Sequence, residues 1–169
     1  MPSLAEINAL PADDFVLTLG GVFEHSPWVA EAVEGRRPFV SIDALHAAMN
    51  AVVTASPLSR KLELIRAHPD LAGRLARLGQ LTTESAREQA SAGLADADES
   101  TIARIGELNS AYLATFGFPF IICARLNKVD AILDSMQVRL HNDADAEVAT
   151  ALSEIGKITF LRLKDLIPD

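Results

Sequence analysis

The sequence contains a single cysteine, Cys123, in 169 residues. One cysteine excludes an internal disulfide framework and a thiolate cluster for zinc or an iron–sulfur group, and it is compatible with a reducing compartment. Residues 1–15 lack the basic start of a signal peptide and the apolar stretch of a transmembrane helix. We therefore expect a cytoplasmic protein that has no membrane partner.

Basic residues are also few. Lys and Arg total 15 against 23 Asp and Glu, which gives a net charge of −8. A chain of this charge repels a polyanion at long range, so we expect no nucleic-acid partner, and an anionic substrate would need local arginines. The sequence has no His-x-x-x-His pair, carboxylate cluster, phosphate-binding glycine loop or dinucleotide fingerprint, and it therefore predicts neither a metal site nor a nucleotide cofactor.

Strand patterns are missing as well. No segment shows the strict alternation of paired strands, whereas almost every apolar run has the three-to-four spacing of a helix. We expect an all-α fold and one compact domain over residues 1–169. Its helices, about eight in number, are predicted near residues 12–21, 27–34, 42–55, 57–67, 83–93, 99–116, 128–140 and 143–166.

His68 lies where the helix predicted near 57–67 must end, because Pro69 disfavours helical geometry at the residue before it. A histidine at a helix C-terminus feels the negative end of the helix dipole, which favours its protonated form and suits it to give or take protons. The same position also suits a histidine that only caps the last turn. Position alone favours the capping role.

A polar stripe is predicted on the helix near 83–93, because residues three and four apart share a helix face. Ser85, Glu88, Gln89 and Ala92 lie on this stripe. A hydroxyl, a carboxylate and an amide beside a small residue suit a compact ligand that carries both donors and acceptors. A capping box formed by Ser85 and Glu88 is at least as good an interpretation.

The segment 116–125 is apolar and is broken by Gly117 and Pro119 between two predicted helices. The helix before it is expected to stop at Gly117, the residue type that best adopts a left-handed conformation. Buried non-helical main chain needs partners, so this segment either presents its main chain to a ligand or forms a short strand-like connector. Cys123 has no activating base nearby in sequence, which favours a buried structural cysteine over a nucleophile.

Together these segments resemble one family, the decarboxylases of 2-oxo-4-hydroxy-4-carboxy-5-ureidoimidazoline (OHCU), an intermediate of urate breakdown. The resemblance rests on three motifs in order: His68-Pro69-Asp70-Leu71-Ala72-Gly73, then Glu84-Ser85 through Glu88-Gln89 with Ala92-Gly93-Leu94, then Phe116 to Arg125. It extends from Phe23-Glu24-His25-Ser26-Pro27-Trp28 to residues 157–163, and so it spans nearly the whole chain.

The resemblance implies an all-helical fold, no cofactor, a homodimer as is frequent in the family, and conversion of OHCU to (S)-allantoin with release of carbon dioxide. It identifies His68 as the catalytic histidine. By the same match, the residues expected to bind the substrate are Pro69, Ser85, Ala86, Arg87, Glu88, Gln89, Phe120, Ile121, Ile122, Cys123, Ala124 and Arg162. Arg162 resembles the arginine that binds the anionic end of the substrate. The motif that surrounds it is shorter than the three motifs above.

The chemistry of the reaction fits these residue types. Loss of carbon dioxide leaves an electron pair that the adjacent C=N bond of the substrate ring accepts, so no cofactor is needed as an electron sink. We expect His68 to act as the acid and base. Glu88, the second catalytic residue that we predict, is expected to orient His68. Gln89 and main-chain groups near Ile122 are expected to hold the ureido arm and the ring carbonyl.

Two other hypotheses stay open at this point. The first is a helical interaction module without catalysis, whose signature would be an exposed apolar patch and no pocket at His68. The second is another ureide-processing enzyme on the same fold, which could use the same residues.

Overall fold

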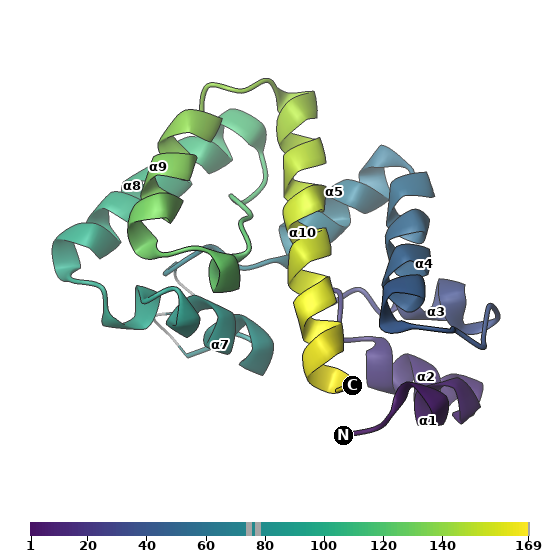
Figure 1. Cartoon of the computed structure of the whole chain (residues 1–169). Helices are drawn as coiled ribbons and strands as arrows, with labels where there is room; N and C mark the ends of the chain where they lie inside the picture. Colours follow the sequence, from purple (N-terminus) through teal and green to yellow (C-terminus); the bar gives the residue numbers. More distant parts are fainter. Residues whose placement is uncertain (74–75, 77–78, 169) are drawn as a thin grey trace. The chain divides into compact units, whose positions relative to one another are not determined.

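The structure of the chain is a computed structural model that describes residues 1–73, 76 and 79–168. Within these residues it contains helices and no β-strand, which confirms the predicted all-α fold (Figure 1). The helices are α1 (Leu4–Ala9), α2 (Ala12–Leu19), α3 (Trp28–Glu34), α4 (Ile42–Ala55), α5 (Leu58–Ala67), α7 (Thr83–Ser91), α8 (Glu99–Phe116), α9 (Val129–Arg139) and α10 (Ala144–Leu166), with 3₁₀ turns η1 (Leu94–Asp96) and η2 (Ala124–Leu126).

Each predicted helix is present, and its ends lie within two residues of the predicted ones. Helix α1 was not predicted, because six residues are too few to show a helical period. Its start carries a local sequence feature that could have revealed it. Ser3 and Glu6 form a reciprocal capping box, in which each side chain accepts a hydrogen bond from the main chain of the other residue.

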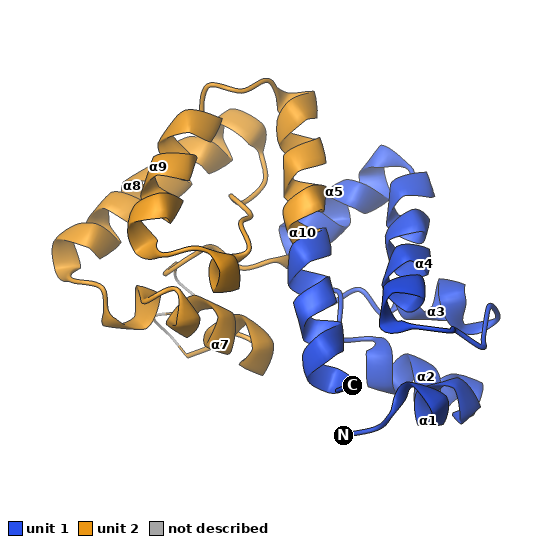
Figure 2. Cartoon of the chain, viewed as in Figure 1, with its two compact units in different colours: residues 1–67, 156–169 blue, residues 68–155 orange. Residues whose placement is uncertain are grey.

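The described chain groups into two compact units, coloured separately in Figure 2. Unit 1 consists of residues 1–67 together with 156–169, and unit 2 is the continuous stretch 68–155. Helix α10 begins in unit 2 and ends in unit 1. The prediction of one domain over residues 1–169 stays a prediction.

Unit 1 has its own core, in which α3 packs against α2 and α4. Its fully buried side chains include Ile7, Phe15, Leu19, Leu45, Met49, Leu64 and Ile65. His46 joins α4 to the last part of α10, since its Nε2 lies 2.8 Å from the carbonyl oxygen of Gly156 and donates to it. Burial lowers the pKa of His46. The imidazole is therefore a neutral structural group at neutral pH.

Unit 2 is built around aromatic side chains at the end of α8. Tyr112 is fully buried, and its ring lies edge-on to that of Phe120, with 5.3 Å between the ring centroids. Helix α8 ends at Gly117, whose φ of +75° confirms the predicted left-handed stop. Residues 117–123 then form neither helix nor strand, and Phe118 and Phe120 turn back into the core.

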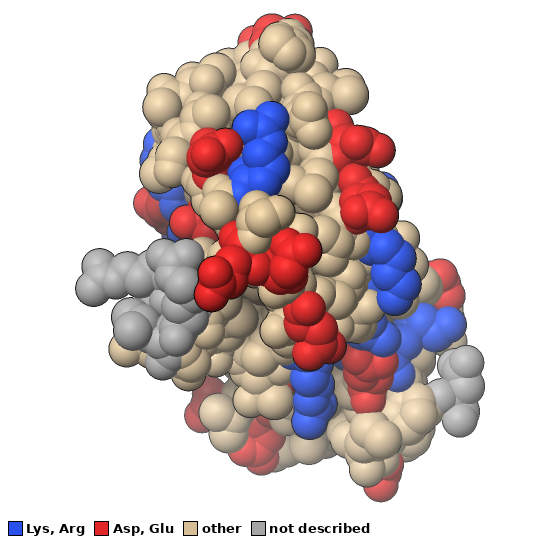
Figure 3. All heavy atoms as spheres, turned by 90° about the vertical axis from the view of Figure 1, so that its left-hand side faces the viewer, with Lys and Arg blue, Asp and Glu red and all other residues tan. Residues whose placement is uncertain are grey.

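The surface carries charges of both signs. On the face shown in Figure 3, acidic and basic side chains are interspersed among neutral ones and do not separate into a broad basic region. No helix in residues 1–73 or 79–168 is long and apolar enough to cross a membrane.

Candidate active site

His68 directly follows α5, which ends at Ala67 as the proline at position 69 predicts. The side chain of His68 is buried, with 6% of the residue exposed. A capping histidine on the surface would keep its ring in water, so this burial favours a role that needs a dry, fixed imidazole. Burial raises the pKa of the Asp70 carboxyl two residues later.

The polar stripe on α7 is confirmed as a buried face of the helix. Ser85, Glu88 and Gln89 are 4%, 8% and 7% exposed. Ala86 and Arg87, which were also predicted to bind the substrate, are exposed. The N-cap of α7 is Thr82, whose hydroxyl accepts from the main-chain N–H of Ser85 at 3.3 Å. Ser85 therefore lies inside the first turn, and its interpretation as the N-cap of a capping box is wrong.

The stripe is bonded to the segment that follows His68. The Oε1 atom of Gln89 accepts from the N–H of Ala72 at 2.8 Å, and its Nε2 atom donates to the carbonyl oxygen of Asp70 at 3.3 Å. Asn109 on α8 donates to the carbonyl oxygen of Leu71 at 2.9 Å. Gln89 thus shapes the segment after His68, in addition to its predicted contact with the substrate.

These bonds hold an unusual backbone. Ala72 has a φ of +48°, in the left-handed region that residues with a side chain rarely adopt. The bonds from Gln89 and Asn109 to residues 70–72 maintain this conformation against its steric cost. The segment that follows His68 is therefore coupled to side chains on α7 and α8.

The predicted wall, residues 120–124, is buried main chain. Its members Phe120, Ile121, Ile122, Cys123 and Ala124 are 1%, 3%, 7%, 0% and 4% exposed. Burial raises the pKa of the Cys123 thiol, in agreement with a structural cysteine rather than a nucleophile. Helix α7 packs against η2, which begins at Ala124, so the polar stripe and the wall belong to one neighbourhood of unit 2.

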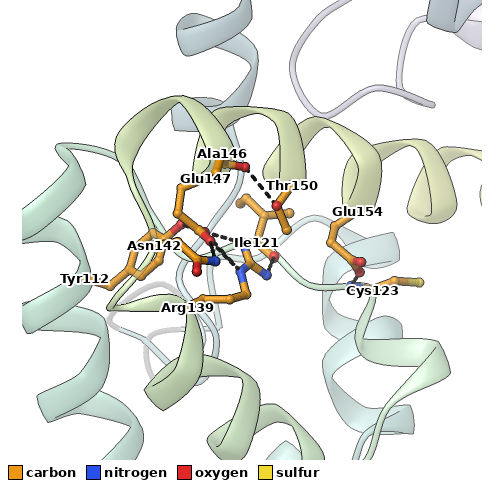
Figure 4. Close-up of polar contacts among 9 residues, drawn as sticks. All are labelled: Tyr112, Ile121, Cys123, Arg139, Asn142, Ala146, Glu147, Thr150 and Glu154. Atoms are coloured by element: carbon orange, nitrogen blue, oxygen red, sulfur yellow. Dashed lines mark hydrogen bonds and ion pairs between the residues drawn. The ribbon is translucent and has the colours of Figure 1, made fainter.

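Buried charged side chains that no local sequence pattern indicates hold this wall in place. Arg139 on α9 donates from Nη1 to the carbonyl oxygen of Ile121 at 2.7 Å (Figure 4). Glu154 on α10 accepts from the N–H of Cys123 at 2.8 Å. From sequence, charges on amphipathic helices are expected on the solvated face, so neither Arg139 nor Glu154 is predicted to be buried.

Arg139 is fixed in turn by Glu147, which is fully buried. Its Nη2 lies 2.9 Å from Oε2 of Glu147, and Asn142 donates to the other carboxylate oxygen at 2.8 Å. The hydroxyl of Tyr112 also donates to Glu147. Burial by itself would raise the pKa of Glu147, but these hydrogen bonds together hold it below its ordinary value.

Arg162 belongs to unit 1, where its Nη1 lies 2.7 Å from Oε2 of Glu24. Both side chains are buried, at 5% and 2% exposure. Glu24 lies in the segment 23–28, which carries part of the family resemblance, and local sequence patterns do not indicate its pairing with a residue 138 positions away. The contact of Arg162 with the substrate stays a prediction. Across the described ranges, no group of three or more His, Cys, Asp or Glu side chains is placed to hold a metal ion.

A family model described as OHCU decarboxylase matches residues 8–164 of the chain. The chain belongs to the OHCU decarboxylase family. It is 42% identical over 164 residues to the 2-oxo-4-hydroxy-4-carboxy-5-ureidoimidazoline decarboxylase of Amia calva, covering 97% of this chain and 94% of that protein. All three motifs of the sequence analysis lie inside the matched region.

Solved structures agree with this family. A crystal structure of (S)-allantoin synthase superposes with a TM-score of 0.80 at 29% identity, covering 99% of this chain and 54% of that one. A crystal structure of OHCU decarboxylase in the presence of (S)-allantoin superposes with a TM-score of 0.71 at 26% identity, covering 93% of this chain and 99% of that one. The family fold therefore includes the helices that carry the candidate site.

Proposed function

We propose that the chain catalyses the decarboxylation of OHCU to (S)-allantoin in urate breakdown. The observation that carries this proposal is the family match over residues 8–164, together with 42% identity to a decarboxylase of this name along nearly its full length. The buried polar groups around His68 support it further, because an interaction module would expose an apolar face there instead.

The reaction proceeds in two stages. The bond between the ring carbon and the carboxylate breaks, carbon dioxide leaves, and the electron pair moves toward the adjacent C=N bond, whose nitrogen takes up a proton. The hydroxyl-bearing carbon then becomes a carbonyl as a proton is delivered to the carbon that carries the ureido group. Since the substrate accepts the electron pair itself, the residues need only position it and transfer protons.

His68 is the residue that we assign to proton transfer. It directly follows the C-terminal end of α5, and it is buried. Glu88 on the buried face of α7 orients it. Delivery of the proton to one face of a fixed intermediate yields a single enantiomer of allantoin.

The remaining predicted residues divide between binding and surface positions. We assign Pro69, Ser85 and Gln89 to substrate binding beside His68, and the main chain of residues 120–124 to the wall. The bonds of Gln89 to Ala72 and Asp70, in the segment after His68, support this assignment. We assign the anionic end of the substrate to Arg162, on the family resemblance. Ala86 and Arg87 have exposed side chains, so we assign them contact through the main chain.

The test is circular dichroism during generation of OHCU from urate by the two upstream enzymes. Wild type should accelerate OHCU decay and yield optically active (S)-allantoin. His68→Ala and His68→Asn should abolish turnover while the helical spectrum is kept, and His141→Ala, at an exposed histidine, serves as the matched control. Glu88→Gln should lose less activity if Glu88 only orients His68. The assignment fails if wild type leaves the spontaneous decay and its racemic product unchanged.

We further propose that the chain is a cytoplasmic homodimer and that residues 1–169 act as one functional domain. A single family model that spans residues of both units supports the shared domain. The reduced, buried Cys123 fits a reducing compartment, and the homodimer rests on the family resemblance. Light scattering coupled to gel filtration tests the homodimer, and fractionation of the native cell tests the location.

A further inference from the structure

The wall of residues 120–124 is held by two buried charges that approach neighbouring peptide planes. Arg139 donates to the carbonyl oxygen of Ile121, and Glu154 accepts from the N–H of Cys123. The carbonyl oxygen of Cys123 accepts from Asn127 Nδ2 at 2.9 Å. Hydrogen bonds to ionised groups are stronger and more directional than those between neutral groups. The peptide planes before and after Ile122 are thus fixed from outside the segment (Figure 4).

The orientation of these planes determines where the polar groups of Ile122 point. In a trans peptide, the C=O and the N–H of one plane point in opposite directions, and the peptide bonds of this segment are trans. Because Arg139 binds the carbonyl of Ile121, the N–H of Ile122 points away from Arg139. Because Glu154 binds the N–H of Cys123, the carbonyl of Ile122 points away from Glu154.

Ile122 lies between the two peptide planes that Arg139 and Glu154 hold, and its own N–H and C=O remain available to a ligand. Neither its N–H nor its C=O forms a hydrogen bond with another residue in the part of the chain that the structure describes. The residue is 7% exposed. Buried main-chain N–H and C=O groups ordinarily form hydrogen bonds. A ureide group offers a carbonyl acceptor next to N–H donors, which is the complement of one main-chain donor and one acceptor.

The cation of Arg139 is itself rigidly held. One edge of its guanidinium binds Glu147, and its Cζ lies 4.3 Å from the centroid of the Phe120 ring. The charges of Arg139 and Glu147 neutralise each other. The carbonyl of Ile121 therefore accepts a hydrogen bond from a fixed donor, and the ion pair adds no net charge to the interior.

We propose that Arg139 and Glu154 are positioning residues that orient the peptide planes flanking Ile122, so that its N–H and C=O bind the ureide group of the ligand. This inference rests on the proposed function, because it names the recognition of the ureide within the same site.

The direct test follows the ¹H–¹⁵N signal of the Ile122 amide while the intact chain is titrated with (S)-allantoin. A proton donated to the ligand carbonyl should move downfield, and its exchange with solvent should slow. A signal that stays in place while other residues respond overturns the inference, and so does the absence of any allantoin binding.

Variants at Glu154 separate positioning from general support of the fold. Glu154→Met removes the acceptor for Cys123 at similar side-chain length, whereas Glu154→Gln keeps an acceptor oxygen. We expect Glu154→Met to raise KM and the dissociation constant for (S)-allantoin about tenfold, with kcat changed by no more than about twofold. Glu154→Gln should restore wild-type binding. The matched control is Glu107→Met, at a glutamate whose side chain is 69% exposed.

Equal loss of binding in the Met and Gln variants, or a loss in kcat at constant KM, contradicts the positioning role. If Glu154→Met does not fold, Arg139→Lys replaces it, since lysine lacks the fork that binds Ile121 and Glu147 together. A failure of the proposed function is distinguishable, because wild type would then leave OHCU decay unchanged even where the Ile122 signal responds to (S)-allantoin.

Discussion

Replacement of Arg139 by methionine should strongly destabilise unit 2. The carboxylate of Glu147 is fully buried and would lose its cation. Removal of one partner from a buried ion pair costs about 3–5 kcal/mol. Tyr112 and Asn142 still donate to Glu147, so we expect the lower end, about 3 kcal/mol. For a chain of this size that corresponds to a fall in Tm of roughly 6–12 °C.

The assay is thermal unfolding followed by circular dichroism. A double variant with Arg139→Met and Glu147→Leu should recover most of the loss, because it contains no uncompensated buried carboxylate. Arg104→Met, at an arginine that is 50% exposed and pairs with Glu107 at 3.0 Å, should change stability by less than about 1 kcal/mol. Equal instability of the single and double variants would refute the argument from buried charge.

The pH dependence of stability gives an independent check. In the wild type the folded pKa of Glu147 lies below its ordinary value of 4.5. Its contribution to stability is therefore complete above pH 4.5 and is lost as the pH falls through the lower folded value. In Arg139→Met, burial should dominate and raise this pKa. The destabilisation by Arg139→Met should then shrink as the pH is lowered and Glu147 becomes protonated.

Two further predictions concern other buried polar contacts, one in each unit. Glu24→Gln should destabilise unit 1 by about 3 kcal/mol, because it removes the buried carboxylate charge that lies beside the guanidinium of Arg162. A change below 1 kcal/mol in urea unfolding, on the order of a surface pair, would contradict this. Asn109→Leu should lower kcat about tenfold with KM little changed, because the carbonyl of Leu71 loses the donor that holds the segment after His68. Steady-state kinetics with an unaltered kcat would show that this bond does not position His68.

The helices were predictable from the sequence because their determinants are local. Helix α4 begins after Ser41, whose hydroxyl accepts from the N–H of Ala44, and α8 ends at Gly117 in a left-handed conformation. A cap and an apolar period are both visible within a few residues. The capping of α7 was predicted less well, because several hydroxyl residues stand at its start and the sequence does not rank them; the N-cap is Thr82 and not Ser85.

Part of the candidate site was also predictable, because some of its residues lie close together in the sequence. His68 and the α7 stripe each lie within one short segment. The residues that fix them come from far away in the chain: Asn109 lies 38 positions from Leu71, and Glu154 lies 31 positions from Cys123. Short sequence patterns do not predict contacts between residues that lie so far apart in the chain. Only the fold identifies which glutamate or arginine of an amphipathic helix is turned inward.

The order of the two units along the chain bears on how the protein is synthesised. Unit 2 is one unbroken stretch, so all of it leaves the ribosome before Arg162, which pairs with Glu24 138 positions earlier. Domains tend to fold as they emerge, and incomplete ones expose apolar surface. Until residues 156–168 have been made, nascent unit 1 therefore lacks the helix segment to which His46 and Glu24 bind. A translating ribosome then carries all the residues of unit 2 together with an incomplete unit 1, and the N-terminal part of the nascent chain is the part that chaperones would need to shield.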